Sequence, residues 1–140
     1  MESEETHCGD ILVVDDAATN QLLISSILSD AGHNVRVADN GVSALMLCEE
    51  SPPDLILLDI RMPGIDGHEV CKLLKESKHT RGISVIFVTV SQEPEDKSRC
   101  FKLGAKDYIT KPFEPIELRI KVHTHIRIRR LEEKLRQLTG

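Results

Sequence analysis

Five polar residues of this 140-residue chain follow short runs of strand-forming residues, at the point where each run ends. They are Asp15 and Asp16 after residues 11–14, Asp59 after 55–58, Thr89 after 85–88, and Lys111 after 108–110. In an open parallel α/β sheet, the carboxyl ends of the strands meet at one edge, and ligands bind there. The sequence therefore predicts that three carboxylates, a hydroxyl and an ammonium group collect at one site.

The three carboxylates favour a divalent cation at this edge. Carboxylates that converge repel one another unless a cation lies among them. All-oxygen ligands on short loops are typical of Mg2+, which keeps several waters that a phosphate can replace, whereas zinc prefers histidine or cysteine. Taken singly, each residue also has a structural explanation as a helix cap, a turn, a strand end or a solvated loop charge. Their common edge favours the functional interpretation.

The elements that must position these residues alternate along the chain. Short apolar runs predict strands, and longer segments with apolar residues three and four apart predict helices. The predicted strands are 11–14, 35–38, 55–58, 85–88 and 108–110, and the predicted helices are 17–30, 42–50, 68–78, 95–103 and 115–138. In the first helix, the predicted apolar side consists of Leu22, Ile24, Ile27 and Leu28. This alternation predicts an α/β domain with a doubly wound parallel sheet.

The last predicted helix contains two different patterns. Its early apolar residues alternate with polar ones, as in a strand: Ile116, Leu118, Ile120 and Val122. Its later apolar residues lie 3, 4 and 3 apart, as in a helix: Ile128, Leu131, Leu135 and Leu138. We expect one helix of about 24 residues, about 36 Å long, whose far end projects beyond the sheet. The apolar stripe on that end predicts either a parallel pair with a second protomer or a frayed, solvated end.

Composition and charge limit the class of protein. Apolar residues make up 40% and charged residues 29% of the chain, which suits one folded domain without a transmembrane run. The net charge is −5, although residues 115–140 carry 7 Lys and Arg against 3 Asp and Glu. An acidic body and a basic segment without aromatic residues argue against nucleic acid or a membrane as partner. We expect a cytoplasmic protein with no chemical role for its histidines and with reduced, mostly buried cysteines: Cys8, Cys48, Cys71 and Cys100.

Taken together, the motifs resemble the receiver domain of two-component response regulators. The matching segments are VVDD (Val13–Asp16), LLDIRMPGIDG (Leu57–Gly67), Thr89 and DYITKPF (Asp107–Phe113). The resemblance covers about residues 10–125 and implies a flavodoxin-like fold, with five parallel strands in the order 2-1-3-4-5 and helices on both faces. Residues 1–9 are then an expected disordered segment. Residues 126–140 are an expected helical extension, either a dimer helix or a linker to an output domain absent from this chain.

The resemblance implies a role for each residue at the predicted edge. Asp59 would take a phosphoryl group from a phosphohistidine of a sensor histidine kinase or a phosphotransfer protein. Asp16, Asp59 and the backbone carbonyl of Arg61 would hold Mg2+, while Asp15 would act largely through a bound water. Lys111 would pair with Asp59 before the reaction and with a phosphoryl oxygen afterwards. Independently of the resemblance, a carboxylate that attacks another anion needs a cation to neutralise charge on both.

The resemblance also implies a conformational switch. Thr89 would hydrogen-bond the phosphoryl group, and Tyr108 would turn into the space that Thr89 vacates. This movement would change the surface formed by the fourth helix, the fifth strand and the fifth helix. The alternative for Tyr108 is a half-buried strand aromatic whose hydroxyl lies in water. The family pattern further implies a cis peptide bond between Lys111 and Pro112.

One residue departs from the family pattern. The family usually has a small residue after the switch threonine, and this chain has Val90. A branched side chain there should crowd the phosphoryl site, so we expect slow dephosphorylation and weak labelling by small phosphodonors. Arg61 is expected either to gate the attack of water or to be an exposed loop cation.

The predicted function is a phosphoaccepting signalling switch that catalyses only its own phosphorylation and dephosphorylation. A phosphatase of the haloacid dehalogenase type would also use Asp and Mg2+, but its DxDx[TV] pattern is absent at residues 15–19 and 59–63. A receiver that docks or dimerises without phosphate is the main alternative, although all five site residues are present. A flavodoxin-like cofactor protein has less support, because no glycine-rich loop follows the first strand.

Overall fold

Strands and helices alternate along the chain in the predicted order. The computed structural model describes residues 8–139. The strands are β1 (Asp10–Val14), β2 (Asn34–Ala38), β3 (Leu55–Leu58), β4 (Ser84–Thr89) and β5 (Asp107–Thr110). The helices are α2 (Ala18–Asp30), α3 (Gly41–Glu50), α4 (Gly67–Glu76), α5 (Pro94–Lys102) and α6 (Pro115–Thr139). The predicted boundaries differ from these by at most two residues.

All strand pairs in the sheet are parallel, and the strand order is β2-β1-β3-β4-β5. In register, Val14 pairs with Leu58, Leu58 pairs with Phe87, and Thr89 pairs with Thr110. The carboxyl ends of the four strands β1, β3, β4 and β5 therefore lie at a common edge. The flavodoxin-like, doubly wound fold predicted from the sequence is confirmed.

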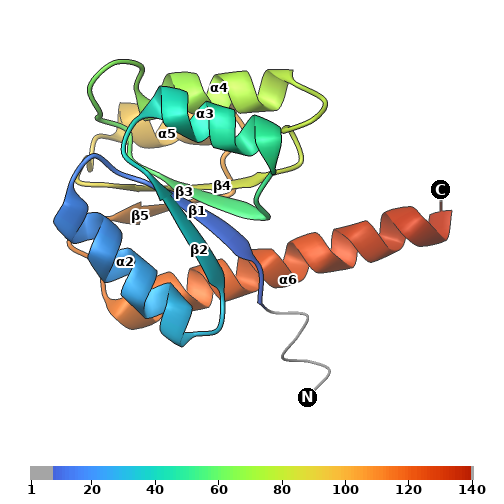
Figure 1. Ribbon diagram of the computed structural model, residues 1–140. Coiled ribbons are helices and arrows are strands. Elements are labelled where there is room, and N and C mark those ends of the chain that lie inside the picture. The colour runs from blue at the N-terminus through green and yellow to red at the C-terminus, as the bar shows by residue number, and fades with distance from the viewer. Residues whose placement is uncertain (1–7, 140) are drawn as a thin grey trace.

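Helices cover both faces of the sheet, with α3, α4 and α5 on one face and α2 and α6 on the other (Figure 1). Successive side chains of a strand point to opposite faces. In β1, Leu12 and Val14 accordingly join the cluster under α3, α4 and α5, while Ile11 and Val13 join the cluster over α2 and α6. Burial on both faces is the reason why the central strands are continuously apolar.

The loop after β3 depends on a glycine at the start of α4. A Cβ at Gly67 would overlap the backbone carbonyl of Asp59, so the helix can approach the end of β3 closely only with glycine there. The side chain of Asp66 caps α4 by accepting a hydrogen bond from the backbone N–H of Glu69 at 2.9 Å. The motif DG at 66–67 therefore fixes the start of α4 directly against the end of β3.

The buried side of α2 differs from the prediction. Ile24 and Leu28 are buried, whereas Leu22 is 72% exposed. Residues two apart on a helix differ by about 200° around its axis, so Leu22 and Ile24 cannot face the same core. The prediction that Leu22 belongs to the apolar side was wrong.

The two patterns of α6 belong to a single helix. Leu118, Val122 and Ile126 are buried, while Ile116 and Ile120 are exposed. Spacing of four residues selects one face of the helix, so the strand-like alternation arises from apolar residues on two different faces.

The far end of α6 projects beyond the sheet (Figure 1). Its later apolar residues are 42% to 84% exposed: Ile128, Leu131, Leu135 and Leu138. The helix passes residue 126 without interruption. The expected disordered segment 1–9 lies mostly outside the described residues, which begin at Cys8.

The four cysteines are free thiols, and three of them are buried: Cys48, Cys71 and Cys100. Burial raises the pKa of Cys48 and of Cys71 to about 11, and that of Cys100 to about 12. The prediction of reduced cysteines in the core is confirmed. Among residues 8–139, none of the helices combines the length and the apolar content that a bilayer crossing requires.

Candidate functional site

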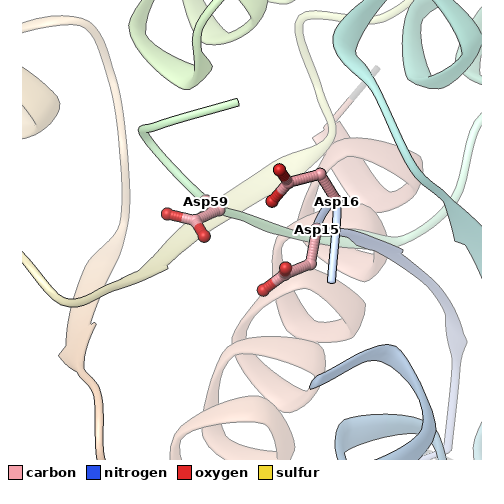
Figure 2. Close-up of side chains that lie close together, drawn as sticks. All are labelled: Asp15, Asp16 and Asp59. Atoms are coloured by element: carbon pink, nitrogen blue, oxygen red, sulfur yellow. The ribbon is translucent and has the colours of Figure 1, made fainter. Parts of the chain in front are cut away.

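Three carboxylates converge at the carboxyl edge of the sheet. Asp15 and Asp16 follow β1, Asp59 follows β3, and one carboxylate oxygen of each lies within 4.8 Å of the others. Figure 2 shows the three side chains gathered around one space between the ends of the strands. Asp15 and Asp59 are buried, whereas Asp16 is exposed. The structure therefore brings together the acidic residues that the sequence singled out.

Lys111 lies between two of these carboxylates. Its Nζ is 2.6 Å from Oδ2 of Asp15 and 2.9 Å from Oδ2 of Asp59, and all three side chains are mostly buried. Burial lowers the pKa of Lys111, but its hydrogen bonds to Asp15 and Asp59 outweigh that effect, so the pKa is raised above its usual value. Lys111 is therefore a fixed positive charge beside Asp59. The peptide bond to Pro112 is cis, as expected.

Asp15 is held by several further groups from the start of α2. Its Oδ1 accepts a hydrogen bond from the backbone N–H of Ala17 at 2.9 Å, and its Oδ2 accepts one from Nδ2 of Asn20 at 3.3 Å. Nε2 of Gln21 donates to the backbone carbonyl of Asp15 at 2.6 Å. These contacts, together with Lys111 on Oδ2, hold both oxygens of the carboxylate. Sequence reasoning missed Asn20 and Gln21, although both polar residues open the helix that follows the aspartate pair.

The loop after β3 wraps closely around Asp59. The backbone N–H of Arg61 points at Oδ1 of Asp59 at 3.4 Å, and the N–H of Gly67 donates to the carbonyl of Ile60 at 2.7 Å. The side chain of Arg61 is 70% exposed, and its Nη2 lies 3.6 Å from Oδ2 of Asp96 on α5. The backbone of Arg61 thus belongs to the site, while its side chain reaches away to α5.

Thr89 and Val90 close the site at the end of β4. The side chain of Thr89 is buried, and its Oγ1 has no hydrogen-bond partner among the described residues. A buried hydroxyl without a partner is costly, so this group is available to an incoming acceptor. Val90 is 63% exposed at the same edge. The backbone of Thr89 also fixes the next strand, because its carbonyl accepts the N–H of Lys111 at 2.8 Å.

The tyrosine of the predicted switch lies in the interior. Tyr108 is 6% exposed, and its hydroxyl donates a hydrogen bond of 2.7 Å to the backbone carbonyl of Ser91. Burial raises the pKa of this hydroxyl, although the hydrogen bond to Ser91 acts in the opposite direction. The hydroxyl is bound to protein in this arrangement, so Tyr108 does not match the alternative of a strand aromatic with its hydroxyl in water.

This arrangement suits chemistry on an anion that carries a transferable phosphoryl group. A buried carboxylate, Asp59, lies next to a fixed ammonium group and to two further carboxylates. The ligand atoms are all oxygens, which are the donors that Mg2+ prefers. A hydroxyl without a partner completes the set. Such a site can offer a nucleophile, positive charge and a hydrogen-bond donor to one phosphoryl group.

Comparisons with known proteins agree with this geometry. The chain matches the response regulator receiver domain family over residues 11–123. A Vibrio cholerae protein named "probable cyclic di-GMP phosphodiesterase" is 38% identical over 135 residues, which are 96% of this chain and 30% of that protein. Protein PilH of Pseudomonas aeruginosa is 38% identical over 104 residues, which are 74% of this chain and 86% of PilH.

The fold comparison gives the same family. The crystal structure of a signal receiver domain of a histidine kinase from Syntrophus aciditrophicus has a TM-score of 0.78 and 35% identity, and the match covers 84% of this chain and 89% of that one. The chain belongs to the receiver domain family of response regulators, and it is a phosphoaccepting switch of two-component signalling. Receiver domains bind Mg2+ at an acidic cluster of this kind and interact with histidine kinases and phosphotransfer proteins.

Proposed function

We propose that Asp59 is the phosphoacceptor, and that the donor is a phosphohistidine of a sensor kinase or a phosphotransfer protein. This proposal rests on the position of Asp59, which is buried beside the other two carboxylates, with its Oδ2 2.9 Å from Nζ of Lys111. In the transfer, one Asp59 oxygen forms a bond to phosphorus while the bond between phosphorus and the histidine nitrogen breaks. The histidine leaves with that electron pair.

Mg2+ fits the donor set of this site. Asp16, Asp59 and the carbonyl of Arg61 would hold it directly, and Asp15 would act through a bound water. The contacts of Asp15 support this division, because Ala17, Asn20 and Lys111 already occupy its oxygens. When bound, the metal supplies positive charge that offsets the repulsion between carboxylate and phosphoryl oxygens.

Lys111 and Thr89 would bind the phosphoryl group from two sides. Lys111 is already paired with Asp59, so its ammonium group has only a short way to move to a phosphoryl oxygen. The hydroxyl of Thr89 would gain the hydrogen-bond partner that it lacks. The phosphoryl group would therefore stabilise an arrangement in which both residues point at residue 59.

Tyr108 would report this event to the surface of α5, β5 and α6. Its buried position is one of two states, and phosphorylation would increase the population of that state through Thr89. The phosphate-independent alternative, a receiver that only docks, gains no specific support, because Asp59 contacts Lys111 and the hydroxyl of Thr89 is buried without a partner among the described residues, as phosphoryl binding would require.

We further propose that the chain has no enzymatic activity beyond its own phosphorylation and dephosphorylation. The Vibrio cholerae relative is named as a phosphodiesterase, but this chain spans only 30% of it. An output activity would belong to residues outside this chain. The exposed stripe of α6 is proposed to pair with a second protomer, while neither nucleic acid nor a membrane is expected as a direct partner. The expected cytoplasmic location stays a prediction.

Intact mass after incubation with a phosphorylated histidine kinase and Mg2+ tests the assignment. We expect a gain of about 80 Da, the mass of one phosphoryl group, that is absent from Asp59→Asn and absent without Mg2+. Asp39→Asn is a matched control, because Asp39 lies outside the acidic cluster. A gain of mass that survives in Asp59→Asn would refute Asp59 as the acceptor.

A further inference from the structure

Asp96, in the first turn of α5, joins two loops that carry parts of the switch. Its Oδ2 accepts a hydrogen bond of 2.6 Å from the hydroxyl of Ser91, in the loop after β4. The same oxygen lies 3.6 Å from Nη2 of Arg61, in the loop after Asp59. Asp96 is mostly buried, with 23% of its side chain exposed. One carboxylate therefore contacts both the phosphoacceptor loop and the loop that follows Thr89.

Ser91 is also the residue that receives Tyr108. Its backbone carbonyl accepts the Tyr108 hydroxyl at 2.7 Å, and its own hydroxyl accepts the backbone N–H of Glu93 at 3.3 Å. Ser91 itself is 8% exposed. The hydroxyl of Ser91 is thus bound on both sides, which holds in place the residue whose carbonyl accepts Tyr108.

We propose that Asp96 is a positioning residue for the switch: it holds Ser91 so that its carbonyl receives the Tyr108 hydroxyl, and it connects this acceptor through Arg61 to the loop after Asp59. The proposal deepens the proposed function and rests on it. The Asp96 contact favours the buried position of Tyr108, because that position keeps its hydrogen bond only while Ser91 stays in place. A shift of the loop after Asp59 would reach Tyr108 by way of Arg61, Asp96 and Ser91.

The neighbouring acidic residue offers a matched comparison. Glu95 lies in the same first turn of α5 but is exposed, and the described structure gives it no hydrogen bond or ion pair. Both acids interact favourably with the positive end of the helix dipole, so removing either costs α5 a similar amount. Only the removal of Asp96 should affect Tyr108.

Tyr108 can be observed selectively, because the chain has one tyrosine and no tryptophan. Incorporation of 3-fluorotyrosine therefore places fluorine at residue 108 alone, and the 19F NMR spectrum reports the populations of buried and exposed rings. The variants are Asp96→Ala, Ser91→Ala, the double variant, Glu95→Ala and Asp96→Asn. Intact mass after incubation with the phosphorylated kinase is measured on the same samples.

We expect Asp96→Ala to lower the ratio of buried to exposed rings about fivefold, the size expected when one hydrogen bond is lost. Ser91→Ala should have the same effect, and the double variant should add nothing, because both changes remove one contact. Glu95→Ala should match the wild type. Asp96→Asn should keep the ratio of buried to exposed rings close to that of the wild type, since its amide oxygen can still accept the Ser91 hydroxyl.

Three results would each overturn the proposal while leaving the proposed function intact, provided the wild type gains one phosphoryl group. The first is a wild-type 19F spectrum for Asp96→Ala. The second is a lowered ratio of buried to exposed rings in Asp96→Ala but a wild-type ratio in Ser91→Ala. This result would mean that the charge of Asp96 acts without Ser91. The third is additive effects in the double variant. If the wild type gains no mass, the proposed function itself fails.

Discussion

The ammonium group of Lys111 lies between two carboxylates that would otherwise repel each other across the site. Replacement by alanine removes the positive charge that a phosphoryl group would meet. We expect Lys111→Ala to lower the rate of phosphorylation by the kinase about 100-fold, the usual effect of removing one charged contact to a reacting oxyanion. Time courses of intact mass measure the rate. Lys106→Ala, at an exposed lysine outside the site, should retain the wild-type rate.

The same substitution should change the affinity for Mg2+ in the opposite direction. Lys111 and the metal compete for the charge of Asp59, so loss of the lysine should tighten metal binding. Calorimetric titration with Mg2+ distinguishes the two effects. Weaker Mg2+ binding in Lys111→Ala would mean that the lysine supports the metal site rather than competing with it.

Val90 tests how a single side chain controls access to the phosphoryl group. It is exposed at the edge of the site, next to the buried Thr89. If it hinders water and small donors, Val90→Ala should speed both loss of phosphate and labelling by a small phosphodonor. A steric barrier of about 1 kcal/mol corresponds to about fivefold in each rate. Equal rates for the variant and the wild type would exclude this role for Val90.

The sequence was sufficient to predict the residues of the site that act through their own chemistry. Asp15, Asp16 and Asp59 end buried strands, and this position alone placed them at one edge. It was not sufficient for residues that act through a partner. Ser91 and Asp96 have ordinary loop and helix positions, and their importance appears only when the carbonyl that accepts the Tyr108 hydroxyl is known.

At the scale of the elements, β3 is anchored at both ends by charged groups. Asp59 follows its carboxyl end, and Asp54 precedes its start. Asp54 accepts the N–H of Asp10 at 2.8 Å, and Nη1 of Arg130 lies 3.0 Å from its Oδ1. Nε of Arg129 lies 3.4 Å from the same oxygen. Asp54 thereby ties α6 to the edge of the sheet opposite the acidic site.

This anchor makes stability depend on pH in a definite direction. Burial raises the pKa of Asp54, but the hydrogen bonds from Asp10 and from the two arginines outweigh it, so the pKa in the folded state lies below its usual value. The stabilisation is then fully present above the unfolded pKa of about 4 and is lost as pH falls through the folded pKa. We expect Asp54→Asn to lower the free energy of unfolding at pH 7 by about 1 to 3 kcal/mol.

Urea denaturation of the wild type and Asp54→Asn at several pH values measures this contribution. The difference between them should shrink as pH falls below about 4, because the unfolded state then binds a proton that the folded carboxylate binds only at lower pH. Glu132→Gln, at an exposed residue of the same helix without a described ion pair, should stay close to the wild type throughout. A difference that is constant with pH would mean that the charge of Asp54 contributes nothing.

The type and order of the helices and strands could be predicted from hydrophobic pattern and turn residues. The errors concern which face of a helix is buried. Leu22 was assigned to the core because it is apolar, although its angle around α2 separates it from Ile24. The alternation in α6 resembled a strand because Ile116 and Ile120 lie on a second, exposed face. Single-residue hydrophobicity cannot decide which face is covered, since that depends on the partner element.

At the scale of the whole molecule, α6 runs from the end of the strand that carries Tyr108 to the far side of the sheet and beyond it. Near its start, Lys121 and His125 contact Asp107 at the beginning of β5, at 3.3 Å and 2.9 Å. Its middle is held by Asp54, as described above. A change at β5 would therefore reach α6 through the contacts of Asp107.

The exposed stripe on the far end of α6 should pair two copies of the chain, and the pairing should be weak. Its four apolar residues span less than two heptads, too few for a stable coiled coil. We expect sedimentation velocity to show a mean mass that rises with protein concentration, and Leu135→Asp to remain monomeric at all concentrations. Burying the charge of Asp in the stripe would cost more free energy than so short an interface provides.

Two comparisons separate pairing through this stripe from other contacts. Gln137→Asp makes the same change of charge, from neutral to negative, on the same turn but outside the stripe, so it should retain the dependence on concentration. Phosphorylation of Asp59 should increase pairing only if the change at β5 reaches α6 through Asp107. In that case Asp107→Asn should pair like the wild type without phosphate and should lose the increase with it. A wild type that stays monomeric at every concentration, phosphorylated or not, would refute pairing through the stripe of α6.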